Sequence, residues 1–181
     1  MTRKSKGVIA LAAATFLAST SLAVAQIAPN PDGSPPGNQE PHLTQVNCGG
    51  TTQKILRTQN APRTINMVNF TPEPGTVVQV VVPDGQSRCV DIEFTGEAAC
   101  GPSNAVDFCY IRAMDNNTEL DPQGGGFQAF QSEDATASAH AYEWIGRLGE
   151  GVHNIRIERR VGNANTDFWL DDWTYDLEVM L

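Results

Sequence analysis

The segment RCVDIEFT, residues 88–95, decides the fold class of this chain. Val90, Ile92 and Phe94 fall on one side of an extended backbone, and acidic side chains lie between them on the other side. Successive side chains of a β-strand point to opposite faces of a sheet. The alternation therefore predicts a strand with one face in a core and the other in water.

Short runs of the same kind extend from this segment in both directions, and turn residues separate them. No stretch keeps a helical period for the roughly 10 to 12 residues that an ordinary helix needs. About eight or nine strands of this length predict an all-β protein, a two-sheet antiparallel β-sandwich of jelly-roll type, with an immunoglobulin-like sandwich as the alternative. The predicted strands are 64–70, 76–82, 88–95, 108–114, 127–130, 137–148, 152–161, 166–170 and 173–179.

Three local patterns add detail to this prediction. The nearly unbroken valines of 76–82 predict a strand that is buried on both faces. The turn Gly149-Glu150-Gly151 predicts a hairpin that pairs the strands on either side of it. The inward-facing parity changes across Asp171-Asp172, which predicts a bulge or bend there.

The first 25 residues have the three parts of a Sec-type signal peptide. A basic start is followed by an apolar run and by the small residues Ala23-Val24-Ala25, the A-x-A pattern of a cleavage site. The alternative is a membrane anchor, but the run is rich in Ala, Ser and Thr and shorter than the roughly 20 strongly apolar residues of a span. We therefore expect cleavage after Ala25, no membrane anchor afterwards, and a periplasmic or extracellular location.

The remaining chain divides into a lead-in and one domain. Residues 26–45 are rich in proline and polar residues, so they cannot bury enough apolar surface to offset the entropy of ordering. Cleavage would remove three of the 12 basic residues and none of the 21 acidic ones, which leaves a formal charge of 9 − 21 = −12. Such a chain repels phosphate backbones, which excludes nucleic acid as a partner. Residues 46–181 are predicted to fold as a single domain.

The four cysteines, Cys48, Cys89, Cys100 and Cys109, lie in that domain. In an exported chain they indicate two disulfides, and three pairings are open. Cys100 and Cys109 bracket a short loop and can meet, which would leave Cys48 to pair with Cys89. The spacings do not resemble the paired thiolates of a zinc site.

Sequence motifs of common enzymes are absent. The chain has no G-x-S-x-G, H-E-x-x-H or Walker motif. Of its three histidines, His140 and His153 would lie at similar heights if their strands formed a hairpin, where they could share a metal ion. No third ligand accompanies them in the sequence.

A group of acidic and aromatic residues is the stronger candidate for a site. Glu143, Asp171 and Asp172 lie near tryptophans, and a glycosidase needs two carboxylates about 5 to 10 Å apart. No cofactor is predicted, although adjacent aspartates at a bend would also suit Ca²⁺. Trp169 is predicted to be exposed because Phe168 and Leu170 have the opposite parity. Structural roles compete: the aspartates turn the chain, and Trp144 and Trp173 fill the core.

These observations favour a noncatalytic module that recognises a glycan, a peptide or an envelope component. The predicted ligand-binding residues are Trp169, Asp171, Asp172, Glu143 and, in the glycine-rich loop 121–126, Gln123. One alternative is a carbohydrate-active enzyme that uses Glu143 with Asp171 or Asp172. The other is a structural subunit that assembles through exposed strand edges or a sheet face.

The last third of the chain is similar in pattern to many secreted bacterial β-sandwich modules. The similarity rests on the glycine-flanked segment 149–161 and on the Trp-rich segment 168–179. It implies the same architecture and identifies no family.

Overall fold

The computed structural model describes residues 48–101, 107–125, 127–132 and 134–181. The predicted signal peptide and the lead-in of residues 26–45 lie outside the described residues. Within the described ranges the chain forms strands and no helix. The strands are β1 (Thr51–Gln59), β2 (Arg63–Ile65), β3 (Thr71–Pro72), β4 (Val78–Val82), β5 (Arg88–Gly101), β6 (Phe108–Asp115), β7 (Thr118–Glu119), β8 (Ala129–Ser132), β9 (Asp134–Leu148), β10 (Gly151–Val161) and β11 (Asp167–Met180).

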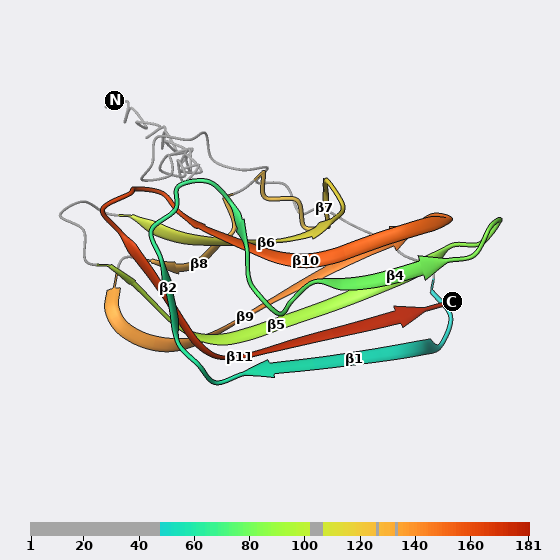
Figure 1. Cartoon of the computed structure of the whole chain (residues 1–181), viewed down its shortest axis with the longest axis horizontal. Coiled ribbons are helices and arrows are strands. Elements are labelled where there is room, and N and C mark those ends of the chain that lie inside the picture. The colour runs from blue at the N-terminus through green and yellow to red at the C-terminus, as the bar shows by residue number, and fades with distance from the viewer. Residues whose placement is uncertain (1–47, 102–106, 126, 133) are drawn as a thin grey trace, which may run out of the picture.

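The strands form two antiparallel sheets that lie face to face (Figure 1). Sheet A has the order β1-β11-β5-β9, and β2 continues beyond β1 along β11. Sheet B has the order β3-β10-β6-β7, with β4 on the same side of β10 as β3 and with β8 paired to β6. The predicted two-sheet sandwich is therefore confirmed.

The pairing is nested from the ends of the chain inward. β1 pairs with β11, β4 with β10, β5 with β9, and β6 with β8. This is the arrangement of a jelly roll, in which an antiparallel ribbon of strands wraps into two sheets. In an immunoglobulin-like sandwich the strands are distributed between the two sheets in a different order, so that alternative is wrong.

The core lies between the sheets and is rich in large rings. Trp144 is 1% exposed and Trp173 is 3% exposed, which confirms the prediction that both fill the core. The Phe94 ring packs 5.7 Å from the Trp173 ring and 5.8 Å from the Phe130 ring, measured between centroids. Residues from sheet A and sheet B thus interdigitate as in other sandwiches.

The valine-rich strand β4 differs from its prediction. Val78, Val80 and Val82 are buried, but Val81 is 64% exposed and Val77, just before the strand, is 46% exposed. β4 belongs to sheet B, which sheet A covers on one face only, so only one face of β4 reaches the core. A run made of valine alone carries no alternation that could have revealed this.

The predicted hairpin at Gly149–Gly151 is also wrong. β9 belongs to sheet A and β10 to sheet B, so this turn carries the chain from one sheet to the other. Turn residues mark a reversal of the chain but do not determine whether the two strands pair side by side or face each other across the core. His140 and His153 consequently lie in different sheets, so the alternative in which they share a metal ion is wrong.

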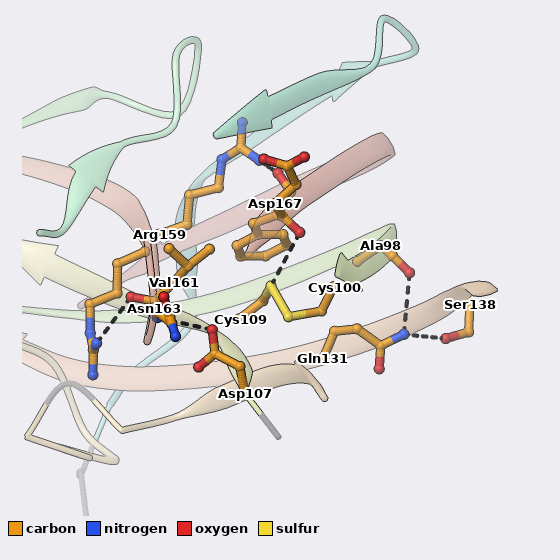
Figure 2. Close-up of a disulfide and its surroundings, with 12 residues drawn as sticks. Ala98, Cys100, Asp107, Cys109, Gln131, Ser138, Arg159, Val161, Asn163 and Asp167 are labelled. Carbon is orange, nitrogen blue, oxygen red and sulfur yellow. Dashed lines mark hydrogen bonds between the residues drawn. A yellow bond between two sulfur atoms is a disulfide. The ribbon is translucent and has the colours of Figure 1, made fainter. Parts of the chain in front are cut away.

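Both favoured disulfides are present. Cys100 on β5 is bonded to Cys109 on β6, so this bond joins sheet A to sheet B inside the core (Figure 2). Beside it, the Gln131 amide nitrogen donates to the Ala98 carbonyl at 3.3 Å and to the Ser138 hydroxyl at 2.9 Å. A buried amide next to the disulfide thus has its hydrogen bonds satisfied.

The second disulfide, between Cys48 and Cys89, ties the beginning of the described chain to β5. At the same place the two ends of the domain meet. The Gly49 N–H donates to the Leu181 carbonyl at 2.5 Å, and the Leu181 N–H donates to the Gly50 carbonyl at 3.2 Å.

The predicted irregularity in the last strand is a β-bulge in β11. Asp171 lies opposite Glu97 and Thr174 lies opposite Thr95, so two residues of β11 face the single residue Gly96 of β5. Asp172 has a positive φ of 43°. A Cβ on Gly96 would come within 3.0 Å of the Leu170 side chain, so glycine allows the close approach that the bulge needs.

Candidate functional site

The bulge coincides with a break in the edge of sheet A. β1 pairs with β11 as far as Gln59 opposite Trp173, and β2 takes over with Arg63 opposite Leu170. Between these two pairs, the segment that connects β1 to β2 has no ladder pairing with β11. The two segments separate and leave an opening at the edge of the sheet.

A pocket of about 270 Å³ occupies this opening. Hydroxyl, amide and carboxylate groups dominate its lining, which consists of Thr58, Gln59, Asn60, Asp172, Trp173 and Thr174. The volume is below the roughly 300 to 1,000 Å³ of sites that enclose a whole small molecule. The pocket can therefore hold one polar unit of a larger ligand.

Trp169 lies on the outer face of sheet A, near the pocket and on the same strand. Its side chain is half-buried, whereas Phe168 and Leu170 are 0% and 1% exposed and point into the core. Its neighbours across the sheet are Thr64 on β2 and Ala99 on β5. Because both neighbours are small, the ring is the largest side chain of that row.

The two aspartates of the bulge have different surroundings. The Asp172 N–H donates to the Asp171 carboxylate at 2.9 Å, so Asp171 stabilises the backbone of the bulge. Asp172 is exposed and lines the pocket. Among the described residues no group of three or more His, Cys, Asp or Glu side chains is arranged to hold a metal ion.

Glu143 and Gln123 lie at the far edge of sheet A, away from the bulge. Asp171 is opposite Glu97, which is opposite Ala139, so Glu143 is two strands across and four residues along. With strands about 4.8 Å apart and a rise of about 3.3 Å per residue, its Cα lies roughly 14 to 16 Å from the Cα atoms of the two bulge aspartates. Side chains stand roughly perpendicular to a sheet, so this backbone spacing does not favour a pair of carboxylates about 5 to 10 Å apart, as a glycosidase needs.

The loop that contains Gln123 is anchored to the same far edge. Asp121, two residues earlier, forms a backbone bridge with Ile145 on β9. Gln123 itself is exposed. The structure therefore brings Trp169, Asp171 and Asp172 together on β11 and separates Glu143 and Gln123 from them.

Sheet A also carries an acidic outer face, which we define as Asp91, Glu93, Glu143, Asp176 and Glu178. Glu93 lies between Glu143 and Asp176 in the ladder, so like charges are direct neighbours. Lys54 on β1 offsets part of this charge, with its ammonium 2.8 Å from Asp176 and 2.9 Å from Glu178. Its hydrogen bond lowers the pKa of Glu178. Alternation placed these residues outward, but their grouping depends on a register that the sequence does not reveal.

Replacing Glu143 with Gln is expected to stabilise the domain at neutral pH. Burial first, and then the Glu143 and Glu178 carboxylates, raise the pKa of Asp91 above its ordinary value. A carboxyl group whose pKa is raised on folding loses stability as the pH rises through that pKa. In the unmodified protein the free energy of unfolding should therefore fall between about pH 4 and 6, as Asp91 ionises. Glu143→Gln should make this fall smaller, and urea unfolding at several pH values measures it. Asp84→Asn, in an exposed turn, should leave the pH profile unchanged, and an unchanged profile for Glu143→Gln would refute the coupling.

The outer face of sheet B has the opposite character and was not foreseen from the sequence. The Arg112 guanidinium lies 3.9 Å from the Phe70 ring centre, and that of Arg160 lies 4.1 Å from the Tyr110 ring centre. Arg112 and Arg156 both form ion pairs with Glu158, at 2.6 and 2.7 Å. The arginines of this cluster thus contact rings and a carboxylate of the same face, so we interpret the cluster as packing over sheet B.

The comparisons with known proteins leave the family of this chain open. No family model matches the chain, and no curated protein matches it. Among solved structures, the chain is similar to the CBM22-1 xylan-binding domain of Paenibacillus barcinonensis Xyn10C, with a TM-score of 0.24 and 10% sequence identity over 75% of this chain and 97% of that domain. A likeness of this size carries no information about a ligand or a site.

The covalent structure bears on the compartment. Two disulfides are typical of proteins in oxidising, exported compartments. In the ranges that the structure covers, no helix has the length and apolar character to cross a membrane.

Proposed function

We propose that this domain is a noncatalytic recognition module that binds a glycan at the bulge site, defined as Trp169, Asp172, Thr58, Asn60 and Thr174. The observation that supports the proposal is the position of a half-buried tryptophan beside a polar pocket on the same strand. The expected compartment is the periplasm or the cell exterior, as the disulfides suggest.

The chemistry of the site suits a sugar. An aromatic face offers an apolar surface against which the C–H side of a sugar ring can pack. The pocket supplies hydroxyl, amide and carboxylate groups, which donate to and accept from sugar hydroxyls. Trp169 and Asp171 are two residues apart on one strand, or about 6.6 Å, and the pocket follows directly. The site can therefore engage neighbouring units of one chain.

Two other classes of ligand or activity fit less well. A peptide is often recognised through backbone hydrogen bonds at a free strand edge, whereas the bulge site presents side chains. A glycosidase needs two carboxylates about 5 to 10 Å apart, and the Cα of Glu143 lies roughly 14 to 16 Å from the Cα atoms of Asp171 and Asp172. Binding without turnover is thus the function that the geometry supports best.

Trp169→Ala is expected to weaken glycan binding at least about tenfold, because truncating a central aromatic contact typically costs more than about 1.4 kcal/mol. The measurement is calorimetric titration with a ligand selected from a panel of plant, bacterial and fungal polysaccharides. The matched control is Phe127→Ala, which removes a ring that is 39% exposed on the sheet B side. This control should bind as the unmodified protein does.

A second variant, Asp172→Asn, tests the pocket while keeping the shape of the side chain and the tolerance for a positive φ. It should lower affinity with a smaller effect than the loss of the ring. Equal affinity of Trp169→Ala and the unmodified protein would overturn the proposed site. Release of reducing sugar by the unmodified protein would move the domain to the enzyme class.

A further inference from the structure

The free edge of β4 is the least protected strand edge in the described part of the chain. β4 pairs with β10 on one side, and no described strand pairs with the other side. The edge strand β1 carries Lys54 and Arg57, charges of the kind that discourage pairing with another molecule. The edge of β9 is occupied in part by the backbone bridge from Asp121 to Ile145.

The composition of this edge is apolar throughout. Residues 76–82 contain no charged side chain. On the outer face Val81 is 64% exposed, and its neighbour across the ladder, Val152 on β10, is 52% exposed. An extended, uncharged edge of β-branched residues is a template for pairing with another strand.

The sequence of this edge also identifies its partner. Residues 77–81 read Val-Val-Gln-Val-Val, which is the same in both directions about Gln79. Antiparallel pairing of two copies about a two-fold axis at Gln79 places Val77 opposite Val81 of the second copy and Val78 opposite its Val80. Residues opposite each other in an antiparallel ladder share a face, so inward valines meet inward valines and exposed ones meet exposed ones.

We infer that two copies of this chain associate by antiparallel pairing of β4 with β4, which makes one continuous sheet from the two copies of sheet B. A two-fold contact of this kind is self-complementary and closed, so it gives a dimer and no larger polymer. The contact is uncharged, and therefore it brings together two acidic chains without placing like charges opposite each other in the ladder. The dimer leaves the bulge site on sheet A outside the contact.

Gln79→Lys is expected to abolish the dimer, because it places two ammonium groups directly opposite each other at the two-fold axis. Gln79 is exposed, so the change should not disturb the fold, which near-ultraviolet circular dichroism checks. The measurement is analytical ultracentrifugation over a concentration series that reaches several hundred micromolar. Val152→Lys is the matched control: it adds the same charge to the same apolar strip but lies one strand from the edge, and it should still dimerise.

A covalent test fixes the register. Opposed residues of an antiparallel pair have Cα atoms about 4.5 to 5.5 Å apart, within the range that a disulfide can bridge. Gln79→Cys should therefore form a covalent dimer under mild oxidation on a non-reducing gel, whereas Gln123→Cys, an exposed position away from the edge, should not. An unmodified protein that stays monomeric throughout the series, a dimer that survives Gln79→Lys, or a dimer that Val152→Lys removes would each overturn the inference.

Discussion

Glu73→Ala is expected to lower the free energy of unfolding by about 3 to 5 kcal/mol, the largest effect of any single change considered for this domain. Glu73 follows β3, and its carboxylate lies 2.5 Å from the Nε of Arg159 on β10. The two side chains are 1% and 2% exposed. Removing the carboxylate would leave a guanidinium charge between the sheets without its counter-ion.

The surroundings of Arg159 explain why it cannot move to water. Its Nη1 donates to the carbonyls of Arg63 and Phe168, at 3.2 and 3.1 Å, and its guanidinium lies 5.2 Å from the centre of the Phe168 ring. Burial raises the pKa of Glu73 and lowers that of Arg159. Both directions mean that desolvation of the pair costs free energy, and the attraction between the partners offsets that cost.

The matched control for Glu73→Ala is therefore the double variant Glu73→Leu with Arg159→Met, which removes both charges and keeps much of the volume. Replacing a buried ion pair by apolar residues is often neutral or stabilising, so the double variant should be more stable than the single one. Urea unfolding followed by far-ultraviolet circular dichroism measures both. A single variant that loses less than about 1 kcal/mol would contradict the account.

Loss of the Cys48–Cys89 disulfide is expected to cost about 4 kcal/mol. The bond closes a loop with a sequence separation of 41. Opening this loop raises the conformational entropy of the unfolded chain, which lowers the free energy of unfolding by about 4 kcal/mol. The variant to measure is Cys48→Ala with Cys89→Ala. Because the effect arises in the unfolded state, the glycan affinity of the folded protein should not change.

The other disulfide provides the comparison. Cys100 and Cys109 are separated by 9 residues, so the same reasoning gives about 3 kcal/mol for the closed loop. Both cysteines are 0% exposed, so alanines would also leave space in the core and alter the near-ultraviolet spectrum. A cost below about 1 kcal/mol for the Cys48–Cys89 variant would show that unfolded-chain entropy is not the main contribution of that bond.

The strands of this domain could be predicted because most of them alternate, whereas their assignment to sheets could not. The alternation in 88–95 and 173–179 identified the inward residues, and the change of parity at Asp171–Asp172 identified the bulge. Alternation states which side of a strand is buried and not which strand lies beside it. The connection at Gly149–Gly151 was misinterpreted for this reason, since pairing and facing strands require the same inward pattern.

The candidate site was predictable in part for the same physical reason. Trp169 follows from the opposite parity of its neighbours. The pocket beside it could not be predicted, because Thr58 meets Thr174 only through the pairing of strands 116 residues apart in sequence. Glu143 was grouped with the bulge aspartates by residue type, although the ladder places it two strands away.

The carboxyl terminus of the chain lies beside Gly49 and the Cys48–Cys89 disulfide, and this sets the orientation in which the domain can be displayed. Trp169 is eleven residues from Met180 along β11, so it lies roughly 35 Å from the place where Leu181 meets Gly49, near the opposite end of β11 (Figure 1). A tether, a surface attachment or a fusion partner joined at the carboxyl terminus would therefore lie far from Trp169 and leave that side chain accessible. Immobilising the protein through its carboxyl terminus should therefore preserve full binding capacity.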